Sequence, residues 1–262
     1  MKILTWNINS VRLRLPLLLK ILDNEKPDVF CLQETKAPDE KFPVLEIVSA
    51  GYPYYHFAGM KSYNGVAIFS KLPLSEKEVY NRCGKEDCRH ISVKINNKYE
   101  LHNLYIPAGG DEPDVEVNEK FKHKLGFVNE LQKFFSKNKS SDDKIIALGD
   151  FNIAPYENDV WSHKQLLKVV SHTPIEVKTL EKFRKSFDWI DVARKFVKLD
   201  EKLYSWWSYR ARDWKKSNRG RRLDHIWVTP NLENKLKSFE ILEKYRGVEK
   251  PSDHVPVVIE LK

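Results

Sequence analysis

The sequence predicts a single domain of the α/β or α+β class, built on two sheets. Short apolar runs typical of strands recur along the chain, and segments with helical periodicity lie between them. At 262 residues the chain is long enough to bury one large core, with two small domains as the alternative. So many strands favour two sheets over one. We therefore treat residues 1–262 as one domain.

Strands are predicted wherever apolar and β-branched residues form a short continuous run. In chain order these runs are Lys2–Trp6, Val29–Gln33, Gly65–Ser70, His90–Ile95, Glu100–Ile106, Ile145–Leu148, His225–Thr229, Phe239–Leu242 and Val255–Leu261. The sequence has no long linker and no internal repeat. The elements therefore follow one another closely, as they do in one compact domain.

Two helices are predicted from apolar residues at helical spacing. Ser10 is expected to cap the first helix. The apolar residues of this helix are Leu15, Leu18, Leu19 and Leu22. The second helix is expected from Glu119 to about Lys137. Its apolar face consists of Phe121, Leu125, Val128, Leu131 and Phe135.

The composition is typical of a soluble protein in a reducing compartment. It is 41% hydrophobic and 31% charged, and no apolar run reaches the ~18 residues needed to span a bilayer. The amino terminus lacks the apolar core of a secretory signal, so we expect a cytoplasmic protein without a membrane span. Cys31 lies in an apolar run and is expected in the core. Cys83, Cys88 and His90 offer one ligand too few for a structural zinc site, so zinc is not predicted.

The chain is basic, with 45 Lys and Arg residues against 37 Asp and Glu residues and a formal net charge of +8. A positive field favours polyanionic partners, nucleic acid among them. A lysine-rich surface that serves only solubility would give the same count, so charge alone does not identify the partner.

Polar side chains follow four of the predicted strands at the point where each strand ends. They are Asn7, Glu34, Tyr105 and Asp150, the last within the stretch KIIALGDFNIAP. One such ending is ordinary turn chemistry, because Asn, Asp and Gly favour loops. If the strands lie side by side, however, the four ends meet at one edge, where open sheets hold their sites. The sequence therefore predicts a site at that edge.

The residues expected there suit a hard cation. Glu34, Asp150 and Asp253 offer carboxylate oxygens, which Mg²⁺ or Mn²⁺ prefers and which differ from the thiols of a zinc site. Asn7 and Asn152 add amides that can bind a metal or orient water without adding charge. The set therefore predicts a magnesium or manganese site.

His254 is the predicted cationic donor of the site. Its ring can donate to a phosphate oxygen, and an acidic partner, for which Asp224 is the candidate, would keep it charged. A metal, a carboxylate that takes a proton from water and a cationic donor together describe phosphodiester hydrolysis. No protein nucleophile is required. His225, next to Asp224, is expected to be structural.

Seven stretches of the sequence resemble the exonuclease III group of apurinic/apyrimidinic endonucleases. In chain order they are WNINS, LQETK, YNGVAIFSK, LYIPAG, GDFNIAP, NRGRRLDHIW and SDHVPV, and they span nearly the whole chain. The wider superfamily, which includes DNase I, sphingomyelinases and inositol polyphosphate phosphatases, shares only the Asn, Glu, GD-x-N and SDH elements. The resemblance implies a DNase I-like fold, a four-layered α/β sandwich of two mostly antiparallel sheets with helices outside.

The resemblance also implies roles for matching residues. Asp150 would activate the attacking water, Asp253 would lie near the metal and leaving group, and His254 would bind the scissile phosphate or join a second metal position. The implied catalytic residues are Tyr105, Asp150, Asn152, Asp224 and His254. The implied metal ligands are Asn7, Glu34, Asp150, Asn152, Asp253 and His254.

The segment Tyr204–Arg222, YSWWSYRARDWKKSNRGRR, combines aromatic and basic residues as DNA-binding surfaces do. A core edge beside a solvated basic face is the alternative. In related enzymes this region lines the pocket for the abasic sugar, and Trp206 and Leu223 match apolar positions of that pocket. The implied DNA-binding residues are Trp206, Lys215, Lys216, Arg221 and Leu223. Arg221, where some relatives have a large aromatic, and Ala108, where others have a polar residue, depart from the pattern.

The sequence thus predicts a metal-dependent nuclease that cuts duplex DNA on the 5′ side of an abasic site. Possible further activities are 3′-to-5′ exonuclease and 3′-repair phosphodiesterase or phosphatase activity. The expected partner is double-stranded DNA with abasic or 3′-blocked sites, the expected state a monomer, and the expected place the nucleoid. The alternatives are a superfamily phosphatase or phospholipase acting on a non-DNA phosphoester, or a DNA-binding relative that has lost catalysis.

Overall fold

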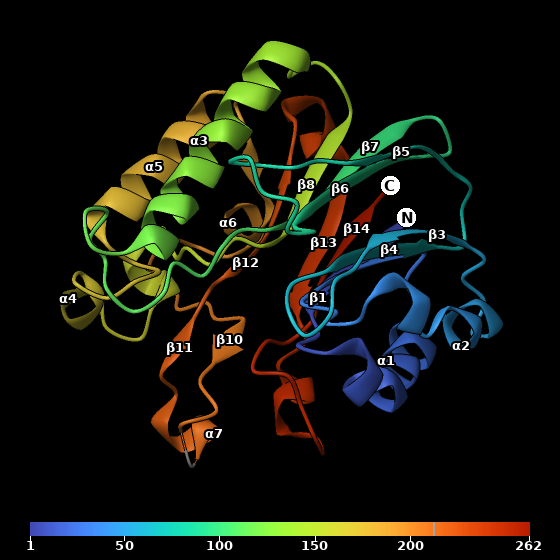
Figure 1. Cartoon of the computed structure of the whole chain (residues 1–262), viewed down its shortest axis with the longest axis horizontal. Coiled ribbons are helices and arrows are strands. Elements are labelled where there is room, and N and C mark those ends of the chain that lie inside the picture. The colour runs from blue at the N-terminus through green and yellow to red at the C-terminus, as the bar shows by residue number, and fades with distance from the viewer. Residues whose placement is uncertain (212) are drawn as a thin grey trace.

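Two six-stranded sheets pack face to face, and helices cover their outer sides (Figure 1). The computed structural model describes residues 1–211 and 213–262. The core between the sheets is made by residues of both, for example Ile68 of the first and Ile146 of the second, each fully buried. Four layers result, as the sequence predicts, and they form a single domain.

The first sheet has the strand order β13-β14-β1-β2-β4-β3. Its strands are β1 (Lys2–Asn7), β2 (Val29–Gln33), β3 (Tyr54–Ala58), β4 (Val66–Ser70), β13 (Leu236–Ile241) and β14 (Val257–Leu261). The pair β1 and β2 is parallel and the other neighbours are antiparallel. The carboxyl ends of β1 and β2 therefore point the same way.

The second sheet repeats this plan with the order β5-β6-β7-β8-β12-β9. Its strands are β5 (Leu74–Val79), β6 (His90–Ile95), β7 (Tyr99–Tyr105), β8 (Ile145–Asp150), β9 (Ile190–Asp191) and β12 (Asp224–Val228). Again one pair, β7 and β8, is parallel. The prediction of two mostly antiparallel sheets is confirmed.

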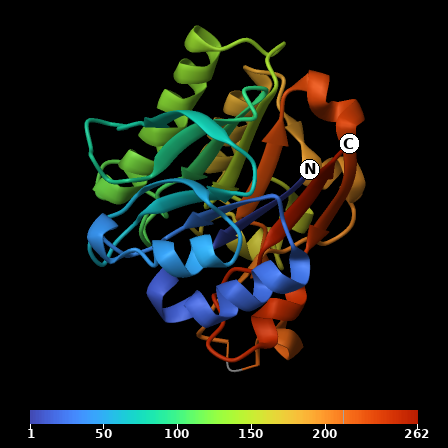
Figure 2. The same ribbon diagram turned by 90° about the vertical axis from the view of Figure 1, so that its right-hand side faces the viewer.

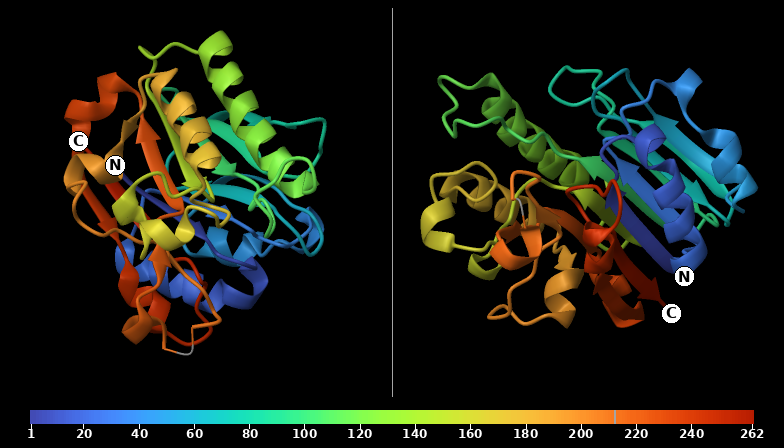
Figure 3. Two further views of the ribbon diagram at one scale, coloured as in Figure 1. Left: turned by 90° about the vertical axis from the view of Figure 1, so that its left-hand side faces the viewer. Right: turned by 90° about the horizontal axis from the view of Figure 1, so that it is seen from below.

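The outer layers are formed by different helices. On the first sheet lie α1 (Val11–Glu25) and α2 (Val44–Ser49), and on the second α3 (Glu119–Asn138) and α5 (Pro174–Lys185) (Figures 2 and 3). The shorter helices are α4 (His163–Leu166), α6 (Val192–Phe196) and α7 (Trp214–Ser217). None of the helices in the described ranges is long and apolar enough to cross a membrane.

The helix α3 follows its sequence pattern closely. Asn118 caps it by accepting hydrogen bonds from the backbone N–H groups of Lys120 and Phe121. All five apolar residues of the predicted face are buried, from Phe121 to Phe135. Helical spacing alone therefore located this helix and its buried side.

The predicted cap of α1 is wrong. Ser10 precedes α1, but its side chain makes no capping hydrogen bond. Its backbone N–H instead donates to the carbonyl oxygen of Glu34 at 2.7 Å, and the residue has a φ of 86°. This backbone contact accompanies a positive φ, which differs from the extended conformation in which a serine normally caps a helix. Of the predicted apolar residues, Leu18 and Leu22 are buried.

Sequence patterns missed strands at the sheet edges. β3 and β5 each pair on one side only, and four of the six residues of β5 are exposed. β5 carries no continuous apolar run, because much of it faces water, whereas β3 has the largely aromatic sequence YYHFA and was not recognised despite it. The two-stranded ribbon of β10 (Trp206–Trp207) and β11 (Gly220–Arg221) was missed as well, since two residues give no periodicity.

Candidate active site

The ends of the two parallel strand pairs meet between the sheets. The Asn7 side chain, at the end of β1, donates through Nδ2 to Glu34 Oε1 at 2.9 Å and to Asp150 Oδ2 at 2.8 Å. Asn7 and Glu34 come from the first sheet, whereas Asp150 ends β8 of the second. The predicted meeting of strand ends at one edge therefore occurs, and one amide joins the two sheets there.

The turn after β8 fixes the Asp150 carboxylate. Gly149 has a φ of 131°, and a Cβ on it would clash with the carbonyl oxygen of Leu104, so a side chain has no room there. Asn152 follows with a φ of 53°. Its backbone N–H donates to Asp150 Oδ1 at 2.9 Å, and its Nδ2 donates to Asp150 Oδ2 at 3.0 Å. The GDFN stretch thus places an aspartate at the edge and holds it with the asparagine.

Asp224 and His254 form a buried pair beside Asp150. His254 Nδ1 lies 2.8 Å from Asp224 Oδ2, and His254 Nε2 lies 3.7 Å from Asp150 Oδ2. Burial alone would lower the pKa of His254, but the carboxylates of Asp224 and Asp150 outweigh it and raise this pKa to about 10. The imidazole is therefore charged at neutral pH, with Nε2 facing the site.

Asp150 carries the most perturbed carboxylate of this cluster. Burial raises its pKa to about 7, against the opposing effect of charged His254 and with added repulsion from Asp224 and Glu34. A carboxylate with a pKa near neutrality is suited to accept a proton.

Glu34 has a second partner that the sequence analysis did not identify. Lys36 Nζ lies 2.8 Å from Glu34 Oε2 and also donates to Asn9 Oδ1 at 2.7 Å. Burial acts to raise the pKa of Glu34, but Lys36 and the Asn7 amide outweigh it, and the pKa lies below its ordinary value. The stretch LQETK predicted a role for Glu34 only. The left-handed backbone conformations of Glu34 and Lys36 bring the Lys36 side chain back to the Glu34 carboxylate.

The donor set fits a divalent cation with oxygen ligands. Within the described residues, Asp150, Asp224 and His254 are the one group of potential ligands whose atoms lie within 4.8 Å of one another. Among those same residues, Asp224 Oδ1 is buried without a hydrogen-bond partner. A buried, unpaired carboxylate oxygen in a cluster rich in negative charge is a position that a hard cation would stabilise.

Asp253 lies at the margin of this cluster. Its Oδ1 accepts from Asn9 Nδ2 at 3.1 Å and its Oδ2 accepts from the Trp206 indole at 2.9 Å. Both oxygens are therefore engaged by neutral donors. The structure links Asp253 to Trp206 more directly than to the other predicted metal ligands.

Tyr105 ends β7 in register with Asp150. Its ring is 7% exposed, and the Arg89 guanidinium lies 4.5 Å from the ring centroid. Burial, and then the Glu34 carboxylate, raise the pKa of the Tyr105 hydroxyl well above its ordinary value. The phenol therefore keeps its proton and can act as a donor. Arg89 is another neighbour that the sequence analysis did not single out.

The segment Tyr204–Arg222 divides into core and surface. Tyr204 and Trp207 are buried, and Arg222 is fully buried. Arg222 donates to both carboxylate oxygens of Asp159 and of Asp191 at 2.8 to 2.9 Å. The hypothesis that all basic residues up to Arg222 face DNA is thus wrong for Arg222, because its charge is neutralised inside the protein. Arg212 lies outside the described residues.

Trp206 and Leu223 lie together beside the Asp150–Asp224–His254 cluster. Leu223 is buried in a small apolar cluster against which Trp206 packs, and Trp206 forms a β-bridge to His254. The Arg221 guanidinium lies 5.2 Å from the Trp206 ring centroid and donates to Val170 O and to Ser171 Oγ. Arg221 thus stacks on Trp206 and is tied to a loop.

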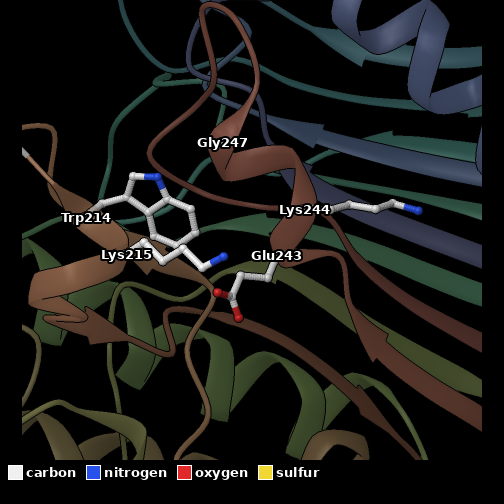
Figure 4. Close-up of a pocket in the computed structure, with 5 residues that line it drawn as sticks. All are labelled: Trp214, Lys215, Glu243, Lys244 and Gly247. Carbon is white, nitrogen blue, oxygen red and sulfur yellow. The ribbon is translucent and has the colours of Figure 1, made fainter.

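Lys215 and Lys216 are exposed on α7, at the tip of the projecting β10–β11 ribbon (Figure 1). Lys215, with Trp214, Glu243, Lys244 and Gly247, lines a surface pocket (Figure 4). None of the predicted catalytic residues lines this pocket. Ala108, the other departure noted in the sequence, is exposed, and its carbonyl accepts a hydrogen bond from Lys124 Nζ at 3.1 Å.

Two histidines outside the cluster have structural surroundings. His90 Nδ1 faces the Arg82 guanidinium at 2.9 Å and its Nε2 faces His102 at 2.9 Å, so both ring nitrogens are engaged. His90, Cys83 and Cys88 form no metal-ligand group within the part of the chain that the structure describes. His225 is buried with Nε2 2.8 Å from Ile153 O.

Comparisons with known proteins agree with this geometry. The family model described as "Endonuclease/Exonuclease/phosphatase family" matches residues 4–254. The chain is 32% identical to exodeoxyribonuclease III of Haemophilus influenzae, and the match covers 100% of both proteins. It is 29% identical to the exodeoxyribonuclease of Bacillus subtilis over 98% of each.

Solved structures give the same result. An AP endonuclease from Archaeoglobus fulgidus matches with a TM-score of 0.93 and 32% identity, covering 100% of this chain and 99% of that one. A 3′-5′ exonuclease from Neisseria meningitidis matches with a TM-score of 0.90 and 29% identity, covering 100% of each. A Neisseria 3′ phosphatase bound to product DNA hairpin has the same TM-score and identity, covering 100% of this chain and 99% of that one.

Proposed function

Because the chain belongs to the endonuclease/exonuclease/phosphatase family, we propose that it is a DNA repair nuclease of the exonuclease III type that cuts duplex DNA 5′ to an abasic site. The observation that supports this most is the buried contact of Asp150 with Asn7 and His254, at the joined strand ends. The similarity to an AP endonuclease and to a 3′-5′ exonuclease supports both the endonuclease activity and additional 3′-end processing.

In this proposal Asp150 takes the proton from the attacking water. Its raised pKa and its fixed position on the turn suit a general base. Asn152, bonded to both oxygens of Asp150, orients the water at the same point. Because both groups are placed at the end of a rigid strand, the base and the water remain aligned. Such alignment supplies a large part of the rate enhancement of enzymes.

The scissile phosphate is bound by His254 and Tyr105. His254 is charged, is aimed by Asp224, and presents Nε2 to the site. Tyr105 keeps its proton and can donate to the phosphate oxygen on which charge develops. Both donors are fixed before the substrate arrives, so they stabilise the transition state without reorganisation.

A divalent cation, Mg²⁺ or Mn²⁺, would be held by Glu34 and Asn7, with Asp150 and Asn152 at its edge. When bound, such an ion neutralises the phosphate and the leaving oxygen. Asp253, at the opposite margin, would contribute to a second ion position, whereas His254, which is charged and held through Nδ1 by Asp224, acts as the phosphate donor and is not a metal ligand in this form. The carboxylates of Glu34 and Asp150, which the Asn7 amide brings together, support a cation there.

DNA is bound in two ways in this proposal. Lys215 and Lys216 contact phosphates, whereas Trp206, Arg221 and Leu223 form the wall against which the abasic sugar packs. The exposure of α7 and the position of Trp206 beside His254 support this division. We further expect a monomer that works on the nucleoid in the cytoplasm.

A cleavage assay on matched duplexes tests this function. Purified protein is given an intact duplex, an abasic duplex and a 3′-phosphorylated duplex, with Mg²⁺ or with excess chelator. We expect metal-dependent cutting 5′ to the abasic site and none of the intact strand interior. Activity on a non-DNA phosphomonoester or phospholipid alone would instead identify a phosphatase or phospholipase, and binding without cleavage an inactive relative.

A further inference from the structure

Lys124 is a buried cation that lies behind the catalytic turn. It comes from α3 and is fully buried. Its Nζ donates to the carbonyl oxygen of Asn152 at 2.8 Å, to that of Ala108 at 3.1 Å and to the carboxylate of Glu176. An ammonium has three donors, and each has an acceptor here. One side chain therefore ties the loop after β7 to the loop after β8.

Glu176 holds Lys124 in place from the other side. It lies in the first turn of α5 and is fully buried. Its oxygens accept from the backbone N–H of Ser171 at 2.9 Å, from that of Thr173 at 3.1 Å and from the Thr173 hydroxyl at 2.7 Å. The carboxylate is thus fixed by backbone donors, so the position of the ammonium is fixed as well.

Ser171 carries this network on to Trp206. Its carbonyl oxygen accepts from the backbone N–H of Ala154 at 2.7 Å, and its hydroxyl oxygen accepts from Arg221 Nη1 at 2.7 Å. Arg221 in turn stacks on the Trp206 ring. A continuous series of contacts therefore runs from the carbonyl of Asn152 through Lys124, Glu176 and Ser171 to Arg221.

The loop after β7 packs closely on the Lys124 side chain. Gly109 has a φ of 91°, and a Cβ on it would lie 2.8 Å from Lys124 Cδ. No larger residue would fit without displacing the lysine or the loop. The loop therefore fits the Lys124 side chain closely at Gly109, in addition to the hydrogen bond at Ala108.

We propose that Lys124 and Glu176 are positioning residues that hold the Asn152 turn at a fixed place relative to the Arg221–Trp206 wall. This inference rests on the proposed function, which assigns the Asn152 turn to the reaction and the Arg221–Trp206 wall to binding of the abasic sugar. The Lys124–Glu176 pair makes no hydrogen bond to a side chain of the predicted metal ligands or to Tyr105; it acts through the backbone carbonyls of Asn152 and Ala108. The reacting groups and the sugar pocket are thereby set by one network.

A stabilising role alone would not explain this arrangement. Replacing a buried ion pair by neutral groups of similar size often leaves stability unchanged. The carbonyls of Asn152 and Ala108, by contrast, have no equivalent donor once the ammonium is gone. Stability and turnover should therefore respond differently to the same replacement.

The variant Lys124→Met/Glu176→Gln separates the two roles. It removes both charges together, and the new amide oxygen still accepts from Ser171 and Thr173. Because the Ala108 and Asn152 carbonyls lose their donor, we expect the urea midpoint to fall modestly; for the folded protein we expect KM for abasic duplex to change less than threefold and kcat to fall about tenfold to a hundredfold. Lys133→Met, an exposed lysine of the same helix, is the matched control and should leave kcat unchanged. A double variant that folds and has wild-type kcat would overturn the proposal.

A second measurement, which does not depend on activity, detects whether a change at Lys124 alters the surroundings of Trp206. In protein labelled with 5-fluorotryptophan, the ¹⁹F resonance of Trp206 is assigned by its loss in Trp206→Phe. We expect this resonance to move in Lys124→Met/Glu176→Gln and in Ser171→Ala, which removes only the acceptor of Arg221, and not in Lys133→Met.

The two measurements also separate this inference from the proposed function. If the wild type cuts no DNA but the Trp206 resonance moves as expected, the proposed function is contradicted, whereas the structural coupling between the Lys124–Glu176 pair and Trp206 is supported. If the double variant does not fold, Ser171→Ala decides. An unmoved resonance together with unchanged kcat in that variant would overturn the network.

Discussion

Asp150, Asp224 and His254 form one buried charged cluster of this chain, and Arg222 forms another with Asp159 and Asp191. In the second cluster one guanidinium bonds to all four oxygens of two carboxylates, and Arg194 adds a further ion pair to Asp159. In the first, the ion pairs leave an unpaired oxygen on Asp224 among the described residues, and a carboxylate with a pKa of about 7.

The difference shows how a buried charged cluster can be assigned to function or to structure. A cluster whose donors and acceptors are all matched gains no further interaction energy when a ligand binds, so it holds the protein's own groups in place and does not bind the ligand itself. A cluster with surplus charge is costly to bury and gains stability when a cation or substrate arrives. Proteins tolerate such a cost mainly at functional sites.

Asp150→Asn should produce the largest effect on activity. Loss of the proposed base should lower kcat on abasic duplex by three orders of magnitude or more, roughly 4 kcal/mol of transition-state stabilisation. The free energy of unfolding should stay the same or rise, because one surplus buried charge is removed. Steady-state cleavage and urea unfolding measure the two quantities; a variant that loses stability but keeps turnover would reverse the assignment of this cluster.

Arg222→Met should give the opposite result. Removing the guanidinium leaves Asp159 and Asp191 buried without their shared partner, at a cost of about 3 to 5 kcal/mol in the free energy of unfolding. Residual folded enzyme should keep near-normal kcat. Arg219→Met, which changes an exposed arginine of the same segment, is the control and should shift stability by about 0.5 kcal/mol or less. Equal stability of the two variants would contradict the buried role.

Buried histidines sharpen the comparison through pH. Burial lowers the pKa of His90 well below its ordinary value, and it also lowers that of His102 despite the nearby Glu100 carboxylate. The unfolded chain therefore binds more protons than the folded one below the ordinary histidine pKa. The contribution of these two histidines to the free energy of unfolding should be complete above about pH 6.5. It should decrease as the pH falls below that value, with a slope approaching ~1.4 kcal/mol per pH unit for each histidine.

Urea unfolding at several pH values measures this slope. His90→Asn should reduce it, because one neutral buried imidazole is gone. The total slope also contains His225, whose pKa burial lowers to about 4, and Asp150, whose raised pKa of about 7 acts in the opposite direction, so the comparison of the two proteins decides: an equal slope in His90→Asn and in the wild type would show that His90 charges freely in the folded state. Arg222, which does not titrate in this range, contributes nothing to the slope.

Trp206→Ala tests the half-buried boundary between the catalytic cluster and the surface. The indole packs beside Leu223 and donates to Asp253, so its loss should weaken cleavage of abasic duplex by about 1 to 3 kcal/mol. Binding to intact duplex should change less. Parallel measurements of cleavage and binding on matched duplexes decide this; equal losses on both would remove Trp206 from the sugar pocket.

The smallest effect is expected for the exposed lysines. Lys215→Ala/Lys216→Ala should leave the free energy of unfolding within about 0.5 kcal/mol of the wild type. It should weaken binding to intact and abasic duplexes alike, and reduce the slope of log K against log salt by up to about 0.9 for each lost phosphate contact. An unchanged salt dependence would mean that α7 does not touch DNA.

Sequence patterns located the strand ends and α3 because those signals are local. A continuous apolar run ending in GDFN needs no distant partner to be recognised, and the heptad-like spacing of α3 is contained within one element. The roles of Arg222 and Lys215 could not be separated in the same way. Arg222 is buried by Asp159 and Asp191, which lie far from it in the chain, and nothing in NRGRR marks one arginine as internal.

The neighbours of the site were missed for a related reason. Lys36 reaches Glu34 only because both of these residues have left-handed backbone conformations, and Lys124 reaches Asn152 only because α3 packs against the second sheet. Both depend on backbone geometry that composition and spacing do not contain. The edge strand β5 was missed because its exposed residues give no continuous apolar pattern.

The order of strands in the first sheet has a consequence for folding. β14 follows all other strands in the chain, yet it lies between β13 and β1, and the Trp6 indole donates to the carbonyl of His254 across 248 positions of sequence. Contacts of such long range form late, because the loop they close is costly in entropy. A growing chain therefore has no complete catalytic centre until β14 is available to pair with β1, so hydrolytic activity should begin only when synthesis of this domain is finished.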